Sequence, residues 1–220
     1  MFLSNKTIKV DETKNEEERK KNIFMKIIDN LHRQIYSPNT IFFDDNSDRT
    51  MASILLRWCH ANKFCIIYNS ENQELSTKQV WRTLQGRTNI VTVICTTTGN
   101  VFGSYHSIIP KRQSSILCDD KKHFMFTLKN PYNVPPTRFK QNLKNENQLI
   151  IHRDIQNSWI FGVGYGFHIR GEDKSYIGSA SGEQLNRGYI DTVGLNSDIF
   201  NDSHYPSYFS FSRILFVQLY

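Results

Sequence analysis

The chain has 220 residues, of which 39% are hydrophobic and 13% aromatic, and this composition excludes a disordered chain. Its length suffices for one sizeable hydrophobic core, or for one domain with an appendage. Lys and Arg number 27 against 21 Asp and Glu, a formal net charge of +6 that is compatible with an anionic partner without demanding one.

The first part of the chain is strongly charged. Residues 6–21 consist mainly of charged and amide side chains, which predicts a solvated segment. Hydrophobic residues then recur at helical spacing over residues 23–35, until Ser37-Pro38 ends the pattern. This amphipathic helix either packs on the chain's own domain, which we favour, or pairs with the same helix of a second copy. We therefore divide the chain into an N-terminal segment, residues 1–46, and a domain, residues 47–220.

An acidic stretch, residues 44–48, precedes the next helix. A calcium-binding EF-hand loop is excluded there, because Arg49 and Leu55 stand where that loop needs Gly and Glu. Asn46, Ser47 or Asp48 is instead expected to cap a helix that ends near Ala61-Asn62. Four side chains at helical spacing are expected on its buried face: Met51, Ile54, Leu55 and Trp58.

A strand and a second helix follow. Residues 64–68 form a short apolar run that predicts a buried strand. Ser76 and Gln79 have the spacing of a helix capping box, and Gly86 stands where a C-terminal cap glycine belongs. These signals predict a helix between Ser76 and Gly86.

The middle of the chain is rich in β-forming residues. Residues 90–95 and 101–106 are joined by a polar turn and predict a hairpin. Residues 124–128 predict a further strand. Residues 133–147 are polar and contain two adjacent prolines, which predicts a loop, and residues 149–151 resume strand character.

The stretch from Ser158 to Ile169 has an unusual division of its faces. Aromatic and aliphatic residues alternate with glycines, so one face is a core wall and the other is nearly bare backbone. We predict one long strand in which Gly162, Gly164 and Gly166 meet a close neighbour. A phosphate-binding loop is disfavoured, because the spacing is G-x-G-x-G and no helix start follows.

The C-terminal part contains two contrasting segments. Residues 174–205 carry many glycines and small polar residues and predict long surface loops. Residues 208–220 predict a central strand, because both faces are apolar: Phe209, Phe211, Leu215, Val217 and Leu219 on one, Ile214 and Phe216 on the other. Together the elements predict an α+β fold, an antiparallel β-sandwich with flanking helices.

The four cysteines have irregular spacing and are interpreted as free thiols of an intracellular protein. A zinc site built from them and some of the seven histidines is disfavoured, because no ligand pair has finger-like spacing. Cys118 lies in a polar stretch and is the thiol expected to be exposed. Its two acidic neighbours disfavour the thiolate, so redox sensing there is a weak hypothesis.

No run approaches the roughly 18 apolar residues of a membrane span. The apolar part of residues 1–6 is too short for a signal peptide. We therefore expect a soluble protein of the cytoplasm or the nucleus.

Several of these segments follow one another in a familiar order. The sharpest are the phrase G-N-V-F-G-S-Y at residues 99–105 and the glycine-alternating run at residues 161–169. From about residue 50 to Tyr220 the chain resembles the TLDc domain of eukaryotic oxidation-resistance proteins. The resemblance implies a TLDc-like fold and structural roles for its motif residues, which are Phe102, Gly103, Phe161, Gly162, Gly164 and Gly166.

The resemblance also implies a non-catalytic role. Family members raise resistance to oxidative stress, and several bind the cytosolic part of the vacuolar proton pump. We therefore expect protein–protein interaction, with subunits of that pump as candidate partners, and no cofactor, metal or catalytic residue. The residues agree, because no G-x-S-x-G nucleophile elbow occurs and the histidines are dispersed.

The candidate interaction surface follows the glycine-rich stretch. It comprises Arg170, Gly171, Glu172, Asp173, Glu183 and Arg187. In animal members this turn is acidic, whereas here it begins with a base.

The alternative function is a DNA-binding transcriptional regulator of the stress response. It is motivated by the net charge and by the basic pairs Lys20-Lys21, Lys111-Arg112 and Lys121-Lys122. No helix-turn-helix, zinc-finger or RNA-binding signature supports it, so nucleic acid is the less favoured partner. An enzyme ranks last.

Overall fold

A computed structural model of the chain describes residues 51–142, 147–153, 159–171, 175–178, 184–201 and 207–220. The chain divides into two compact units, residues 1–45 and 46–220, and the fold below is that of the second. The helix predicted over residues 23–35 and the predicted cap at residues 46–48 lie outside the described residues. The domain boundary after residue 46 stays a prediction.

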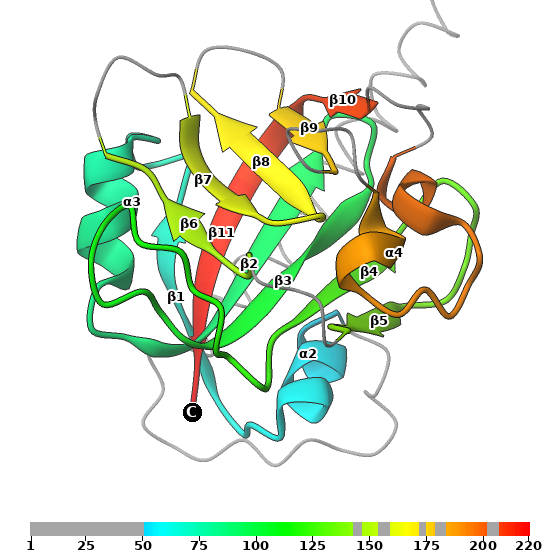
Figure 1. The fold of residues 1–220 in the computed structure, drawn as a ribbon, viewed down its shortest axis with the longest axis horizontal. Coiled ribbons are helices and arrows are strands. Elements are labelled where there is room, and N and C mark those ends of the chain that lie inside the picture. The colour runs from blue at the N-terminus through cyan, green and yellow to red at the C-terminus, as the bar shows by residue number, and fades with distance from the viewer. Residues whose placement is uncertain (1–50, 143–146, 154–158, 172–174, 179–183, 202–206) are drawn as a thin grey trace, which may run out of the picture. The chain divides into compact units, whose positions relative to one another are not determined.

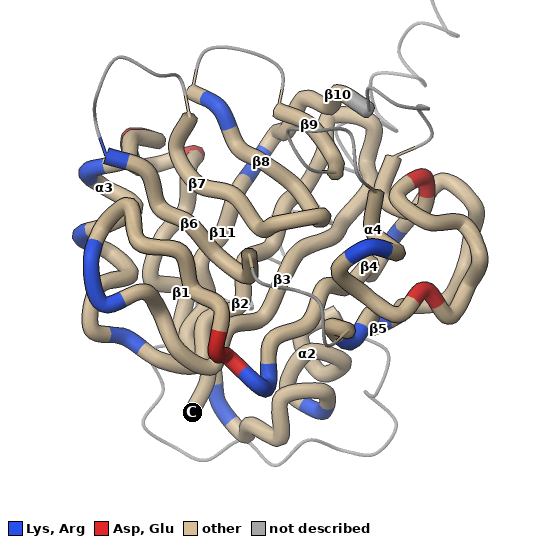
Figure 2. Tube along the Cα trace, in the orientation of Figure 1, with Lys and Arg blue, Asp and Glu red and all other residues tan. Residues whose placement is uncertain are grey.

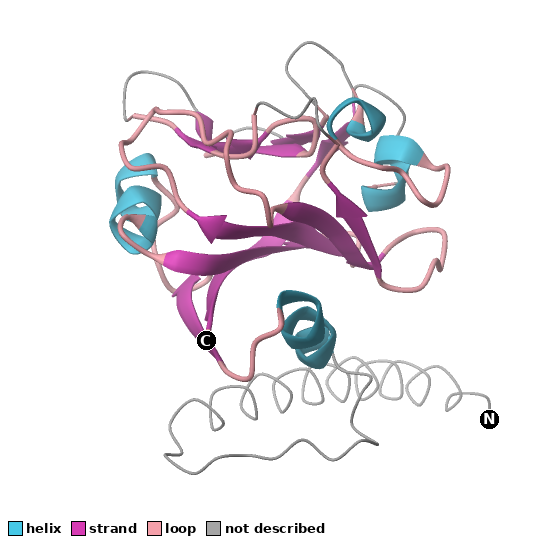
Figure 3. Ribbon diagram, turned by 60° about the horizontal axis from the view of Figure 1, so that its bottom comes forward, coloured by secondary structure: helices cyan, strands magenta, loops and turns pink. Residues whose placement is uncertain are grey.

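Two antiparallel sheets form the domain (Figures 1 and 3). The six-stranded sheet has the order β1 (Phe64–Asn69), β11 (Phe211–Leu219), β2 (Thr88–Thr96), β3 (Val101–Ile108), β4 (Phe124–Lys129) and β5 (Thr137–Lys140). The five-stranded sheet has the order β10 (Ser207–Phe209), β9 (Ser175–Ile177), β8 (Phe167–Arg170), β7 (Trp159–Val163) and β6 (Ile150–Ile151). The helices are α2 (Met51–Cys59), α3 (Thr77–Leu84), α4 (Leu185–Gly188) and the 3₁₀ helix η2 (Asn196–Phe200). The predicted α+β sandwich is confirmed.

The main core lies between the sheets, and Phe102 of β3 is at its centre. Its ring centroid is 5.3 Å from those of Phe200 and Phe209 and 5.9 Å from that of Phe167. Phe161 of β7 packs in the same core, 5.4 Å from Phe216 of β11. All six side chains are at most 5% exposed, so the two motif phenylalanines hold the sheets together.

A second core lies on the outer face of the six-stranded sheet, under α2 (Figure 3). Leu55 and Leu56 are buried there, and Trp58 packs at 6.2 Å from both Phe124 and Phe126. Met51, predicted to be buried, is 42% exposed. The prediction is wrong because the buried face of α2 centres on Leu55 and Leu56 and turns away from the first residue of the helix.

The local signals for the next elements are confirmed. The Ser76 hydroxyl accepts a hydrogen bond from the Gln79 backbone N–H at 3.3 Å and caps α3. Gly86 has φ +72° just beyond the helix. β2 and β3 form the predicted hairpin, and Gly99 in its turn has φ +86°.

The predicted single strand over Ser158–Ile169 is wrong. The chain instead makes the hairpin β7–β8, closed by a tight turn in which Gly166 N–H donates to Val163 O at 2.9 Å. Tyr165 takes φ +59° in this turn. The flanking Gly164 and Gly166 have no positive φ, so the left-handed conformation of the turn falls on Tyr165.

The predicted close approach at the three glycines is confirmed. A Cβ atom built on each would overlap with a different neighbour: His168 for Gly162, the Asn147 carbonyl for Gly164, and Met125 for Gly166. Motif residue Gly103 is equally constrained, since a Cβ there would overlap with Thr92 O on the adjacent strand. These motif glycines are therefore structural.

Two predicted loops contain regular elements. Residues 133–147 include β5, whose Phe139 is fully buried. Residues 174–205 include β9, α4 and η2, which supply buried Ile177, Leu185, Ile199 and Phe200 to the main core. The loop predictions are wrong because elements of three to five residues are too short to show a hydrophobic period.

The predicted central C-terminal strand is confirmed for β11, which lies between β1 and β2. Residues 207–209 form β10 of the other sheet, so the chain changes sheets at Ser210. Phe211, predicted to share a face with Leu215, packs in the main core instead. The reason is a register shift between Phe211 and Arg213, which changes the face that follows.

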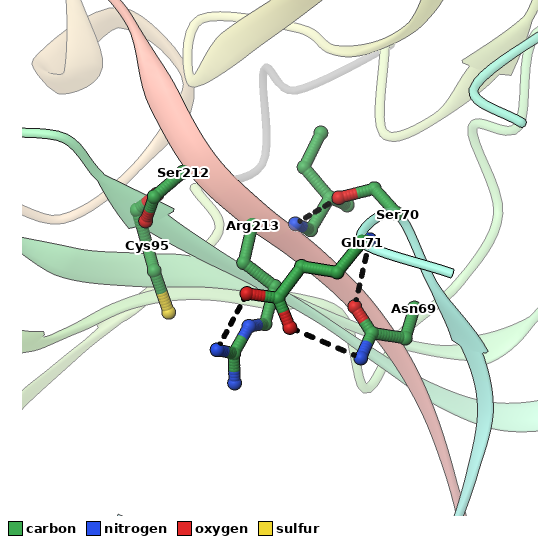
Figure 4. Close-up of polar contacts among 7 residues, drawn as sticks. Asn69, Ser70, Glu71, Cys95, Ser212 and Arg213 are labelled. Atoms are coloured by element: carbon green, nitrogen blue, oxygen red, sulfur yellow. Dashed lines mark hydrogen bonds and ion pairs between the residues drawn. The ribbon is translucent and has the colours of Figure 1, made fainter. Parts of the chain in front are cut away.

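Polar contacts fix β11 where its register shifts (Figure 4). Ser70 exchanges bonds with Ile214, its hydroxyl accepting from Ile214 N–H at 2.9 Å and its N–H donating to Ile214 O at 3.0 Å. Arg213 Nη2 lies 2.8 Å from a Glu71 carboxylate oxygen. The irregular strand end is thereby tied to the chain segment that follows β1.

Candidate functional site

The predicted interaction surface is only partly described. Arg170 ends β8, Gly171 follows it and is exposed, and Arg187 is exposed on α4. Glu172-Asp173 and Glu183 lie outside the described residues.

The structure does not bring Arg170 and Arg187 together. A Cβ on Gly188 would overlap with Tyr165, so α4 packs at the turn end of the β7–β8 hairpin. Arg170 pairs with Trp159 at the open end of that hairpin. Figure 1 shows α4 and the end of β8 near opposite ends of the β7–β8 hairpin. An interaction role for either residue stays a prediction.

Arg170 and four aromatic side chains form a group on the outer face of the five-stranded sheet. His168, Arg170 and Tyr176 are chain neighbours of the core residues Ile169 and Ile177. Because side chains alternate along a strand, these three face away from the other sheet. We call this group the aromatic face, and it comprises Trp159, His168, Arg170, Tyr176 and Tyr208.

The aromatic face is held together by ring contacts. The Arg170 guanidinium lies 5.7 Å from the Trp159 ring centroid, a cation–π contact. Tyr176 meets Trp159 edge to face at 5.4 Å and stacks on His168 at 4.8 Å. Tyr208 pairs with Tyr176 across β9 and β10 and is 49% exposed. The face therefore presents rigid aromatic area and a cation.

His168 occupies the space that Gly162 leaves open. It is 9% exposed, and within the described residues neither ring nitrogen has a hydrogen-bond partner. Burial, together with the smaller effect of the neighbouring His152, lowers the pKa of His168 to about 4. The ring is therefore neutral at pH 7 and acts as an aromatic group.

A second histidine cluster lies inside the sandwich. His106 and His123 stack at 4.4 Å with 19° between their planes. His123 Nδ1 is 2.8 Å from Tyr105 O, and its Nε2 is 2.7 Å from the Tyr189 hydroxyl. The Ser104 hydroxyl is 3.0 Å from His106 Nε2.

These contacts define the protonation of His123. A carbonyl only accepts, so Nδ1–H donates to Tyr105 O and Nε2 accepts from the Tyr189 hydroxyl. Burial lowers the pKa of His123 to about 4, and burial with the adjacent His123 lowers the pKa of His106 well below its ordinary value. Both rings are neutral in the fold at pH 7.

Ser104 and His106 have the spacing of a nucleophile and a base, but both are 0% exposed. A substrate would need access to the hydroxyl, and the interior of a packed sandwich excludes it. The pair therefore supports the core. The sequence alone indicates that Ser104 and His106 lie on the same face of their strand, since residues two apart on a strand share a face.

A pocket of about 660 Å³ lies on the outer side of the six-stranded sheet, beside the C-terminal end of α2. We call it the basic pocket, and its cations are Lys121, Lys122, Arg138 and Lys140. Figure 2 shows basic positions on the segment that leads into β4 and on β5. Lys121-Lys122 was singled out from the sequence. Arg138 and Lys140 were missed because they lay in a predicted loop.

The thiols and metal-binding side chains complete the survey. All four cysteines are free, and Cys118 is exposed as predicted. Burial raises the pKa of Cys59 to about 12 and raises that of Cys95, which keeps both thiols protonated. In the described part of the chain, no three His, Cys, Asp or Glu side chains are grouped as metal ligands. Nor does any described helix have the length and apolarity needed to cross a membrane.

Comparison with known protein families matches residues 36–206 to the TLDc domain. The match covers well over half of the chain, which therefore belongs to the TLDc domain family, as the sequence motifs predicted. No curated protein matches the chain closely enough to serve as a relative. β10 and β11 follow the matched span, although β11 is central to the six-stranded sheet.

Proposed function

We propose that this TLDc protein is non-catalytic and protects cells against oxidative stress through protein–protein interaction. Subunits of the vacuolar proton pump are the candidate partner, and the cytoplasm or the nucleus is the proposed compartment. The observation that carries the proposal is the family match over residues 36–206, because resistance to oxidative stress is the role that the family resemblance implies.

The buried Ser104–His106 pair supports the non-catalytic part of the proposal. Both side chains are 0% exposed, and the pKa of His106 lies well below its ordinary value because of burial. A general base is most effective when its pKa is near the working pH and when its nitrogen or oxygen atom reaches the proton that it removes. Neither condition holds for this histidine.

The aromatic face supports the interaction part. Tyr, Trp and Arg are enriched among the residues that dominate protein–protein binding energies. Trp159 and Arg170 hold each other in place through their cation–π contact. These side chains therefore lose less conformational entropy when a partner binds. Tyr208 is 49% exposed and offers the most accessible ring of the face.

DNA binding is the second candidate function. The basic pocket favours it, because Lys121 and Lys122 are joined there by Arg138 and Lys140. Cations clustered on one surface are the electrostatic feature that phosphate backbones recognise.

Affinity capture from the native cell, followed by mass spectrometry with and without nuclease, tests both candidates. We expect pump subunits among the captured proteins, in equal amounts after nuclease treatment. Capture that nuclease abolishes would move DNA binding to first place. Capture of neither pump subunits nor nucleic acid would contradict both.

Two tyrosine variants connect the capture to the aromatic face. Tyr208→Ala removes a ring from the face, whereas Tyr132→Ala removes a ring of similar exposure, 41%, from the β4–β5 connection. A central aromatic contact is worth about 2 kcal/mol, or roughly 30-fold in affinity. We expect Tyr208→Ala to lose the partner and Tyr132→Ala to keep it. Equal capture by both variants would exclude the aromatic face as the interface.

A further inference from the structure

The basic pocket concentrates positive charge on the outer side of the six-stranded sheet. Among its described lining residues are four cations and no Asp or Glu side chain. Within the described part of the chain, the ammonium groups of Lys121, Lys122 and Lys140 form no ion pair. Like charges held close together repel one another. An anion inside the pocket would remove that repulsion.

Arg138 is oriented before any ligand arrives. Its Nη1 donates to Trp58 O at 3.0 Å, and its guanidinium lies 5.3 Å from the Phe124 ring centroid. This bond uses one of five N–H donors, and the others make no hydrogen bond to the described residues. A fixed, planar guanidinium with free donors is suited to the paired oxygens of a phosphate group.

Asp120 directly precedes the two lysines but forms no ion pair with either of them. It is 1% exposed, and its carboxylate accepts from the Ser107 N–H at 2.6 Å and hydroxyl at 2.5 Å. It also accepts from the backbone N–H of Lys122 at 3.0 Å. The carboxylate thus ties the loop to the end of β3 and fixes the backbone that carries Lys121 and Lys122.

The size and walls of the pocket suit a small molecule. Its volume of about 660 Å³ lies in the range of ligand sites. Trp58, Tyr105 and Phe124 provide aromatic walls between the cations. The Tyr105 hydroxyl donates to Asn89 at 2.9 Å, which fixes that wall. An organic group could pack on these rings while its anionic groups meet the lysines.

We propose that the basic pocket binds an organic anion with two or more phosphate groups, either free or as the headgroup of a lipid. Four cations match several negative charges better than a single carboxylate. Arg138 engages one phosphate bidentately, and the lysines act as point charges on the others. This proposal does not rest on the protective role or on a protein partner.

Calorimetric titration of the full chain at fixed ionic strength, with tripolyphosphate and with inositol hexakisphosphate, tests the proposal. Lys121→Gln with Lys122→Gln removes two pocket cations. Lys111→Gln with Arg112→Gln removes the same charge from exposed positions outside the pocket and is the matched control. We expect the first pair to weaken binding about tenfold or more, and the control pair to change it less than about twofold.

Two results would overturn the proposal. One is no binding of either anion by the unaltered chain, and the other is equal weakening by the two variant pairs, which would indicate non-specific attraction. Duplex DNA that binds through Lys121 and Lys122 while both polyphosphates fail would instead assign the pocket to nucleic acid. Flotation with phosphatidylcholine vesicles that contain phosphatidylinositol bisphosphate distinguishes a lipid headgroup from a free soluble anion as the ligand. Binding to these vesicles supports a lipid headgroup, and binding of the soluble anions alone supports a free ligand.

Discussion

The buried histidines make the domain sensitive to acid. His123 and His168 each have a pKa of about 4 in the fold, against 6.5 when unperturbed. The unfolded chain therefore binds protons below pH 6.5 that the fold rejects. The contribution of these histidines to the free energy of unfolding is fully present above pH 6.5, and it is lost as the pH falls toward the pKa in the fold. His106 shifts in the same direction.

The size of the effect follows from these values. At pH 5 the difference in proton binding costs about 2 kcal/mol for each of His123 and His168, or about 4 kcal/mol together. A domain of this size is typically stable by about 5–15 kcal/mol. The free energy of unfolding, measured by urea denaturation at pH 7.5 and pH 5, should fall by a large fraction of its total.

Two histidine variants separate titration from hydrogen bonding. His168→Phe removes a ring whose nitrogens have no hydrogen-bond partner within the described residues. It should leave stability at pH 7.5 unchanged or higher, and reduce the loss at pH 5 by about 2 kcal/mol. His123→Phe should reduce the pH dependence similarly but cost about 1–3 kcal/mol at pH 7.5, because it removes the hydrogen bonds of His123 to Tyr105 O and to the Tyr189 hydroxyl.

A non-titrating core variant, Ile94→Val, is the control and should lower stability equally at both pH values. An unfolding free energy that is the same at pH 7.5 and pH 5 would refute the neutral, buried state of the histidines. So would a pH dependence in His168→Phe that equals that of the unaltered chain.

Two further predictions concern the fold. Gly164→Val should lower the melting temperature by the equivalent of a few kcal/mol, because its Cβ would overlap with the Asn147 carbonyl; an unchanged melting temperature would show that the turn has room. A chain stopped after Phe211 should not fold, because it loses Ile214 and Phe216, both 0% exposed and each worth about 1.5–3 kcal/mol. A chain lacking residues 1–18 is the control and should fold, and equal thermal unfolding of the two truncations would refute the central position of β11.

The sequence predicted elements whose signals are local. Ser76 and Gln79 are three residues apart, and their capping contact appears as expected. The hairpin turn at Gly99 is likewise set by adjacent residues. The turn at Tyr165 was missed because Asn147 and Gly188, distant in sequence, contribute to its surroundings. Strand alternation alone does not distinguish a long strand from a hairpin that keeps the same faces.

The candidate sites depended on contacts that no local pattern contains. His106 and His123 come from different segments, and Tyr189 joins them from beyond α4. In the basic pocket, the pairing of β4 with β5 places Lys140 opposite Phe124 and so brings it near Lys121-Lys122. The aromatic face was missed because its residues were assigned to two separate strands and to the loops between them.

Survival of peroxide-treated cells that lack this protein tests the central claim most directly. Reintroduction of the unaltered chain and of Ser104→Ala should restore survival, since the buried hydroxyl takes no part in chemistry. Tyr208→Ala should fail to restore it although the protein accumulates normally, since the aromatic face has lost its accessible ring. Failure of a folded Ser104→Ala variant, or survival that does not depend on the protein at all, would contradict a non-catalytic protective role.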